Sequence, residues 1–318
     1  MSLAMLDERR TQVSYTPKSL NDKAMLMRLS ISQWTARKYD KNISEKVAGD
    51  YNTTKEAGRY NKVLIAQDAI KRISQIVTKA RDFHEKQTLP WDDDGVRLLP
   101  AANYMNYTSN MRKLKSEYES AVNDFVLNYP VYVENARRSL NGMFRVEDYP
   151  THEKLCLKYS FETKVTPLPV SSDFRVSIRD EEIQAIRVEI EMRMMNAQAV
   201  AMKDLWLRLF NSVDHMASTL SKSDPRIYDT LIGNIQEVVE LLPRLNIADD
   251  MLLEKMRQEV AQKLCHFSPE ALRRNPLQRA VAAQEAQQIA NTMKDALNMS
   301  CSEPPDMQDI MHGYMGGR

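Results

Sequence analysis

Residues 180–223 read DEEIQAIRVEIEMRMMNAQAVAMKDLWLRLFNSVDHMASTLSKS, a stretch that contains neither Gly nor Pro. Its apolar residues recur at a mean spacing of about 3.7 residues, which is typical of one face of an α-helix. The pattern predicts a single helix that spans about 60 Å at 1.5 Å per residue. We expect this helix to pack along 101–141 as a hairpin or to pair with a second copy of the chain. Its apolar face comprises Ile183, Ile186, Ile190, Met194, Ala197, Ala201, Leu205, Leu209, Val213, Met216 and Leu220.

Glycine is scarce, with 8 in 318 residues, and three of these lie in the last six positions. Loops that cradle phosphate need Gly, because the backbone must approach the ligand with φ angles that other residues resist. Neither G-x-x-x-x-G-K-[ST] nor G-x-G-x-x-G occurs in the chain. The sequence therefore excludes these two classes of nucleotide-binding motif, and we expect a helical, non-enzymatic protein.

Three short stretches alternate apolar and polar residues with the period of a half-buried strand: 25–34, 157–165 and 174–178. The first is distant in sequence from the other two, so a sheet built from them would join the N-terminal region to the middle of the chain. The expected fold class is mostly α, a long-helix bundle or hairpin with a small antiparallel or mixed β-sheet. The side chains expected to share one core on this sheet are Leu29, Ile31, Tyr159 and Phe161.

Helical spacing recurs elsewhere in the chain. Further helices are expected at 57–87, at 101–141 with a kink or break at Pro130, at 225–242, at 249–265 and at 276–298. The expected organisation is a flexible N-terminus at 1–22, a basic region with helices and the small sheet at 23–178, the long helix with a C-terminal helical bundle at 179–299, and a disordered tail at 300–318.

The composition indicates a cytoplasmic protein. Three cysteines lie far apart, which fits a reducing compartment. The N-terminus is charged where a signal peptide needs an apolar stretch, and no run approaches 18 apolar residues, so no membrane association is expected. The five histidines share no metal-ligand spacing, and no nucleophile elbow is present, so we expect no metal, cofactor or catalytic residues.

Positive charge is concentrated in the N-terminal part of the chain. Residues 1–88 hold 17 Lys and Arg against 10 Asp and Glu, whereas residues 223–318 hold 10 against 14. Cations interleaved with aromatic residues are typical of single-stranded nucleic-acid binding, because the charges follow phosphates while rings stack on bases. A solvated loop beside a sheet edge would have the same composition. The candidate nucleic-acid-binding residues are Arg28, Trp34, Arg37, Lys38, Lys41, Lys46, Lys55, Arg59, Tyr60 and Lys62.

Five segments resemble an uncharacterised family of phage and bacterial proteins, a domain of unknown function. They are LSISQWTARKYDK (29–41), AGRYNKVLI (57–65), TLPWDDDGVRLLPAANYMNY (88–107), FRVEDYP (144–150) and SDFRVSI (172–178). The resemblance covers roughly residues 24–265. It implies no catalytic residues, but it does imply that the gene lies near those of a MoxR-type AAA+ ATPase and a von Willebrand A-domain protein.

Two classes of function stay open. The first is a non-enzymatic phage-type accessory protein that binds nucleic acid, single-stranded DNA above all, in replication, recombination or polymerase recruitment. The second is a protein–protein adaptor for the AAA+ ATPase and its A-domain partner, with the long helices as the docking surface. A structural role in the virion is a further alternative, and homo-oligomers are compatible with each.

Overall fold

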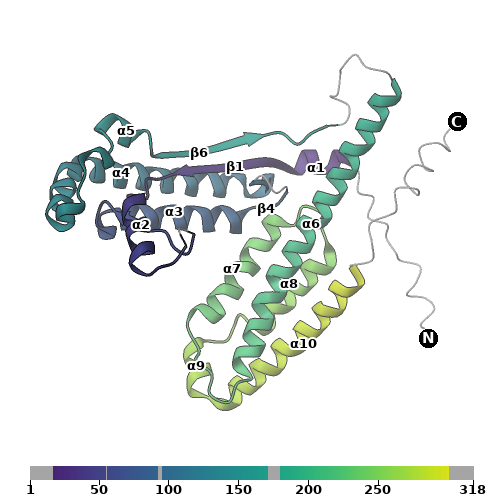
Figure 1. Ribbon diagram of the computed structural model, residues 1–318. Helices are drawn as coiled ribbons and strands as arrows, with labels where there is room; N and C mark the ends of the chain where they lie inside the picture. The colour runs from purple at the N-terminus through teal and green to yellow at the C-terminus, as the bar shows by residue number, and fades with distance from the viewer. Residues whose placement is uncertain (1–16, 55, 92–94, 171–179, 301–318) are drawn as a thin grey trace, which may run out of the picture. The chain divides into compact units, whose positions relative to one another are not determined.

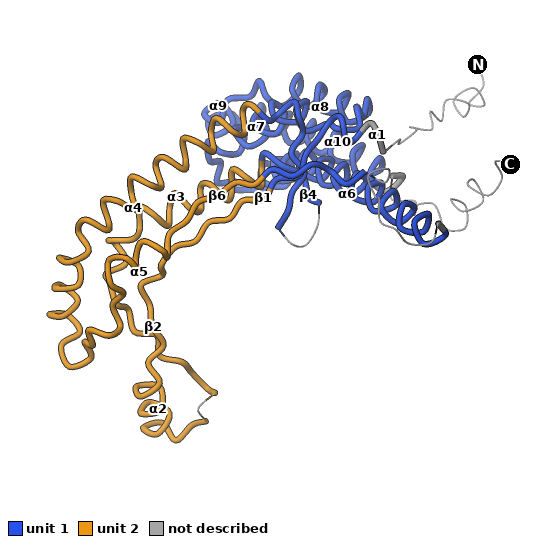
Figure 2. The backbone as a smooth tube through the Cα atoms, turned by 90° about the horizontal axis from the view of Figure 1, so that it is seen from above, with its two compact units in different colours: residues 1–27, 87–104, 165–318 blue, residues 28–86, 105–164 orange. Residues whose placement is uncertain are grey.

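The computed structural model describes residues 17–54, 56–91, 95–170 and 180–300. Helices dominate these residues, and a small sheet accompanies them, which confirms the expected fold class (Figure 1). The chain forms two compact units (Figure 2). Unit 1 draws on residues 1–27, 87–104 and 165–318, and unit 2 on residues 28–86 and 105–164. This grouping differs from the expected division at residue 178, because two N-terminal segments pack with the C-terminal helices.

Each unit contains helices and strands from separate parts of the chain. Those wholly or mainly in unit 1 are α1 (Pro17–Lys23), β4 (Leu89–Pro90), β5 (Val96–Pro100), the 3-10 turn η2 (Ala101–Asn103), α6 (Asp180–Leu220), α7 (Thr230–Leu245), α8 (Met251–Lys263), α9 (Pro269–Arg274) and α10 (Pro276–Ser300). Those wholly or mainly in unit 2 are β1 (Ala24–Ser32), β2 (Arg37–Tyr39), α2 (Lys41–Asp50), β3 (Asn61–Val63), α3 (Gln67–Gln87), α4 (Tyr104–Leu140), η3 (Asn141–Met143), η4 (Val146–Asp148), α5 (His152–Cys156) and β6 (Ser160–Thr166).

Four strands form one sheet in the order β4-β5-β1-β6. The strands β1 and β6 run side by side (Figure 1), and the hydroxyl of Ser32, at the end of β1, lies 2.8 Å from that of Ser160, at the start of β6. The expected pairing of the N-terminal strand with the middle of the chain is therefore confirmed. Phe161 is buried on this sheet, whereas Leu29 and Ile31 are half-buried.

The second strand begins later than its sequence pattern predicts. Residues 152–156 form α5, and Leu157 is the C-cap of that helix rather than a strand residue. Its side chain is 84% exposed. The strand expected at 174–178 lies outside the described residues.

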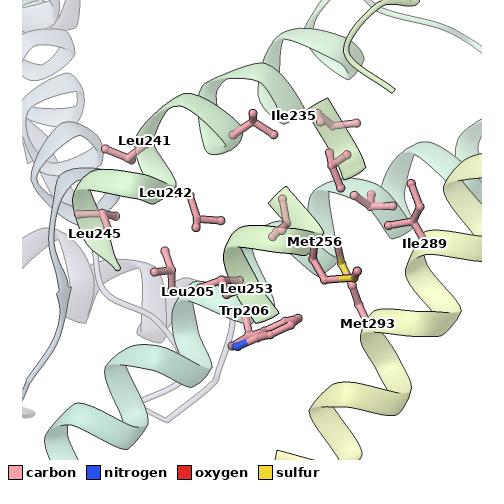
Figure 3. Close-up of a cluster of buried hydrophobic side chains, with 14 of the residues drawn as sticks. Leu205, Trp206, Ile235, Leu241, Leu242, Leu245, Leu253, Met256, Ile289 and Met293 are labelled. Carbon is pink, nitrogen blue, oxygen red and sulfur yellow. The ribbon is translucent and has the colours of Figure 1, made fainter. Parts of the chain in front are cut away.

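The core of unit 1 forms where α6 packs against α10, α7 and α8. Leu205 and Trp206 of α6 meet Leu242 of α7, Met256 of α8 and Met293 of α10 in a buried cluster (Figure 3). Large apolar side chains from four helices thus exclude water from one continuous interior.

The long helix is confirmed, but the first alternative for its packing, along 101–141, is wrong, and pairing with a second copy stays a prediction. The apolar face of α6 packs mainly on α10 and α7, and from Met194 onward it is buried within unit 1. The helix α4 belongs to unit 2 and runs through Pro130 without a break. The expected helix at 57–87 begins only at Gln67, because residues 61–63 pair with β2 as strand β3.

Candidate nucleic-acid interface

The basic stretch of the sequence folds into a small lobe of unit 2, made of β2, α2 and β3. The two strands pair antiparallel, with Lys38 opposite Lys62. Asp40 caps α2 by accepting a hydrogen bond from the backbone N–H of Ile43 at 3.2 Å. In Figure 2, α2 lies apart from α3 and α4, beyond the end of β2. This placement leaves most of the lobe's side chains in solvent.

Lys62 is the exception, since its side chain is only 2% exposed. Its ammonium lies 2.5 Å from Oδ2 of Asp148 and 3.5 Å from Oδ2 of Asp40, and it donates to the carbonyl of Met143 at 3.0 Å. A lysine ammonium has three N–H donors, and each of them has a partner here. Lys38 binds the other oxygen of Asp148 at 2.7 Å. This group, Lys38, Asp40, Lys62 and Asp148, balances two positive and two negative charges.

The ionisation of both carboxylates follows from these contacts. Burial alone would raise the pKa of Asp148, but the hydrogen bonds from Lys38 and Lys62 lower it below its usual value. The backbone N–H of Ile43 lowers the pKa of Asp40, against the effect of burial, and Lys62 adds to the lowering. Both groups are therefore charged at neutral pH, and the four charges of the group cancel.

Two of the predicted nucleic-acid-binding residues are buried, so we correct their assignment. Lys62 is engaged in the ion group, and Trp34 is only 9% exposed. The ring of Trp34 lies edge-on to Tyr129, with centroids 5.9 Å apart, and 6.4 Å from Phe125. Both residues belong to a basic, aromatic stretch of the sequence, but in the folded chain their side chains are buried.

The other predicted residues lie mostly in solvent. Arg28 is exposed on β1, Arg37 on β2, and Lys41 and Lys46 on α2. Arg59 and Tyr60 precede β3, and Tyr60 is 39% exposed. Lys38 is half exposed despite its pairing with Asp148, and Lys55 lies outside the described residues.

A hollow beside β2 collects cations that the sequence does not place together. It has a volume of about 590 Å³, and its lining includes Arg37 and Lys38 from β2 and Lys154 and Lys158 from α5 and the turn after it. Apolar lining residues are Trp34, Leu64, Pro150 and Leu157. More than a hundred residues separate Arg37 from Lys154, which is why sequence reasoning missed the second pair.

The charge of this hollow is positive. Glu147 and Asp148 are the carboxylates among its lining residues, and Asp148 is already neutralised by its lysine partners. Arg37, Lys154 and Lys158 form no ion pair with any residue that the structure describes. Against the single charge of Glu147 they leave an excess of two positive charges.

A second cavity of the lobe, of about 340 Å³, lies between α2 and the segment before β3. Tyr51 and Tyr60 line it, together with Val47, Arg59 and Gly58. Tyr51 is 79% exposed. Exposed aromatic rings beside cations are the elements that a base-stacking surface needs.

The described part of the chain offers neither a metal site nor a membrane span. No group of three or more His, Cys, Asp or Glu side chains among those residues could hold a metal ion. Within the same residues, every helix is too short or too polar to cross a membrane.

Comparison of the chain with protein-family models, with curated proteins and with solved structures gives no match.

Proposed function

We propose that this chain is a non-enzymatic, cytoplasmic accessory protein that binds single-stranded nucleic acid through unit 2. The observation that carries the proposal is the hollow, whose lining brings together Arg37 with Lys154 and Lys158 from a distant segment, three cations without an ion pair among the described residues. Charge of this kind follows a phosphate backbone, and the exposed rings of Tyr51 and Tyr60 on the adjoining lobe supply surfaces for unstacked bases. The resemblance to phage proteins supports a role in replication, recombination or polymerase recruitment.

The ion group supports the proposal because it neutralises the carboxylate of Asp148, which lines the hollow. A free carboxylate at the position of Asp148 would repel phosphate, but two lysines bind it. The cations left over are Arg37, Lys154 and Lys158, with Lys41, Lys46 and Arg59 on the adjoining lobe. A strand could thus contact the hollow and the lobe within one unit.

The test is the salt dependence of binding. Fluorescence anisotropy with a labelled 30-mer of single-stranded DNA gives the dissociation constant at several salt concentrations. Each phosphate contact contributes about −0.7 to the log–log slope on single strands. Replacing Arg37, Lys154 and Lys158 by Ala should therefore flatten the slope by about 2.

The matched control replaces three exposed cations elsewhere, Lys113, Lys203 and Lys255, by Ala. We expect this variant to keep the wild-type slope. If the wild-type protein binds no oligonucleotide at low salt, or if both triple variants change the slope equally, the hollow is not a nucleic-acid interface.

One observation favours the alternative, an adaptor that binds other proteins. Leu127 and Val131 are strongly exposed on successive turns of α4, with Pro130 beside them. Exposed apolar patches of this kind mark protein contacts. The resemblance points to the MoxR-type AAA+ ATPase and the A-domain protein as partners. Pull-down with these two proteins and a Leu127→Asp/Val131→Asp variant distinguishes the roles, since nucleic-acid binding should survive that change.

A further inference from the structure

A separate cavity lies within unit 1, where α6 ends and α7 begins. Its volume is about 390 Å³, and its lining comes from the last turns of α6, the connecting segment and the first turns of α7. This volume lies toward the lower end of the range for small-molecule sites, about 300–1,000 Å³. The cavity is therefore large enough for a ligand rather than only for water.

The lining favours an anion. His215, Lys222 and Arg226 supply N–H donors, and Asp224 is the one carboxylate among the lining residues. All four side chains are exposed, so the cations are accessible from solvent. A guanidinium binds two phosphate oxygens at once, and an ammonium adds a mobile positive charge. Phosphate is an anion that these donors fit.

A hydroxyl group on the same lining adds an uncharged donor beside the cations. Thr219 is only 8% exposed, yet it lines the cavity. Its hydroxyl forms no hydrogen bond with a residue in the described part of the chain, whereas the neighbouring Ser218 and Ser221 bond to backbone carbonyls. The hydroxyl oxygen is open to the cavity, so it can donate a hydrogen bond to an anion bound there.

The start of α7 adds to the preference for negative charge. Asp229 occupies the N-cap, but its carboxylate makes no capping bond and pairs with Arg273 instead, at 2.5 Å. Thr230 and Leu231, the first residues of the helix, line the cavity. The positive end of the helix dipole is thus directed to the same place as the cations.

Tyr228 supplies an aromatic surface beside these groups. It lines the cavity and is 65% exposed, which is unusual for so large a ring. A planar base stacked on this ring would cover it. We propose that the cavity binds a mononucleotide, with the phosphate at Arg226, Lys222 and the Thr219 hydroxyl, and the base on Tyr228. This inference goes beyond the nucleic-acid interface, because it concerns unit 1 and a free nucleotide.

Isothermal titration of the full chain with adenosine monophosphate tests the proposal, with adenosine and inorganic phosphate as separate probes. We expect one saturable site for adenosine monophosphate. Adenosine alone and inorganic phosphate alone should each bind at least about tenfold more weakly. Arg226→Ala should weaken nucleotide binding about tenfold or more, and Thr219→Val should weaken it several-fold. Tyr228→Ala should remove the advantage of the nucleotide over phosphate, whereas Tyr228→Phe should keep it.

Two controls separate this site from the rest of the molecule. Lys255→Ala removes an exposed cation of α8 that does not line the cavity, and it should leave binding unchanged. The Arg37→Ala/Lys154→Ala/Lys158→Ala variant should also bind the nucleotide normally, even if it loses nucleic acid. Circular dichroism checks that each variant is folded. The proposal is overturned if no mononucleotide binds saturably at millimolar concentration, or if Arg226→Ala binds as the wild type does. The proposal is also overturned if the Arg37→Ala/Lys154→Ala/Lys158→Ala variant loses nucleotide binding while Arg226→Ala keeps it.

Discussion

Lys62 and Asp148 form a buried ion pair, with Nζ 2.5 Å from Oδ2, that joins β3 to the segment after α4. Lys38, directly opposite Lys62 across the β2–β3 pair, binds the other oxygen of the same carboxylate. Like charges opposite each other in a sheet are destabilising. The carboxylate of Asp148 offsets this repulsion, because each of the two ammonium groups binds one of its oxygens.

Asp148→Asn should lower the free energy of unfolding of unit 2 by about 3–5 kcal/mol, since it leaves Lys62 buried with only part of its counter-charge. Urea unfolding followed by circular dichroism measures this change. Glu147→Gln, at the exposed neighbouring position, is the matched control and should cost less than about 1 kcal/mol. Equal effects of the two substitutions would contradict the importance of the ion group.

The same pair predicts how stability depends on pH. The pKa of Asp148 is lowered in the folded protein, because the hydrogen bonds from Lys38 and Lys62 outweigh the effect of burial. A lowered folded pKa adds stability above the unfolded value, about 3.9, and this stability is lost as the pH falls through the folded pKa. Urea midpoints of the wild type should therefore drop more steeply below about pH 4 than those of Asp148→Asn. Parallel curves for the two proteins would refute the linkage.

Trp34→Ala should destabilise unit 2 rather than weaken nucleic-acid binding directly. The indole is buried against Phe125 and Tyr129, and truncation of a buried Trp costs about 3–5 kcal/mol. Thermal unfolding measures the loss, and Trp34→Phe should show a smaller one. At a temperature where the Ala variant stays folded, its affinity for single-stranded DNA should match the wild type. A weakened affinity at unchanged stability would instead indicate a base contact.

Asp250 links α8 to α6 in unit 1. Its replacement should lower the free energy of unfolding more than replacement of an ordinary surface carboxylate does. One oxygen caps α8 through the N–H groups of Leu252 and Leu253, and the other accepts from the indole of Trp206 at 2.9 Å. Asp250→Ala should lower the free energy of unfolding by about 2–4 kcal/mol, from a lost cap and an unpaired indole N–H. Denaturant unfolding tests this, with Asp214→Ala on the exposed face of α6 as control. A loss below about 1 kcal/mol would show that water replaces the carboxylate.

The long helices of this fold, α3, α4, α6, α7, α8 and α10, could be predicted from the sequence because their apolar residues recur with helical spacing. Short segments could not. Val63 fits the apolar spacing of the following helix, yet it pairs with Arg37 in β3. Leu157 continues the alternation of the next strand, yet it ends α5 and lies in solvent. For Val63 tertiary pairing overrides a local pattern of only a few residues, whereas at Leu157 a local hydrogen bond from its N–H to the carbonyl of Glu153 continues the helix instead.

The candidate interface could be predicted only where its residues are contiguous. Arg37, Lys41 and Arg59 stand in one basic stretch and lie in solvent. Lys154 and Lys158 were missed, because only the fold brings α5 to the hollow beside β2. Lys62 was misassigned for the same reason, since the carboxylate that holds it in the interior is 86 positions away.

The tyrosines of the lobe decide whether unit 2 prefers single strands. Tyr51 and Tyr60 line one cavity beside Arg59, and neither ring lies in the core. Stacking of a base on an aromatic ring contributes about 1–3 kcal/mol and needs an unpaired base. Tyr51→Ala/Tyr60→Ala should therefore weaken binding of single-stranded DNA about tenfold or more, with the salt slope unchanged because no phosphate contact is lost. Tyr51→Phe/Tyr60→Phe retains both rings and should bind as the wild type does. Anisotropy with single-stranded and duplex 30-mers measures each variant. Equal weakening on both DNAs, or a flatter slope, would mean that the tyrosines position the cations instead of stacking on bases.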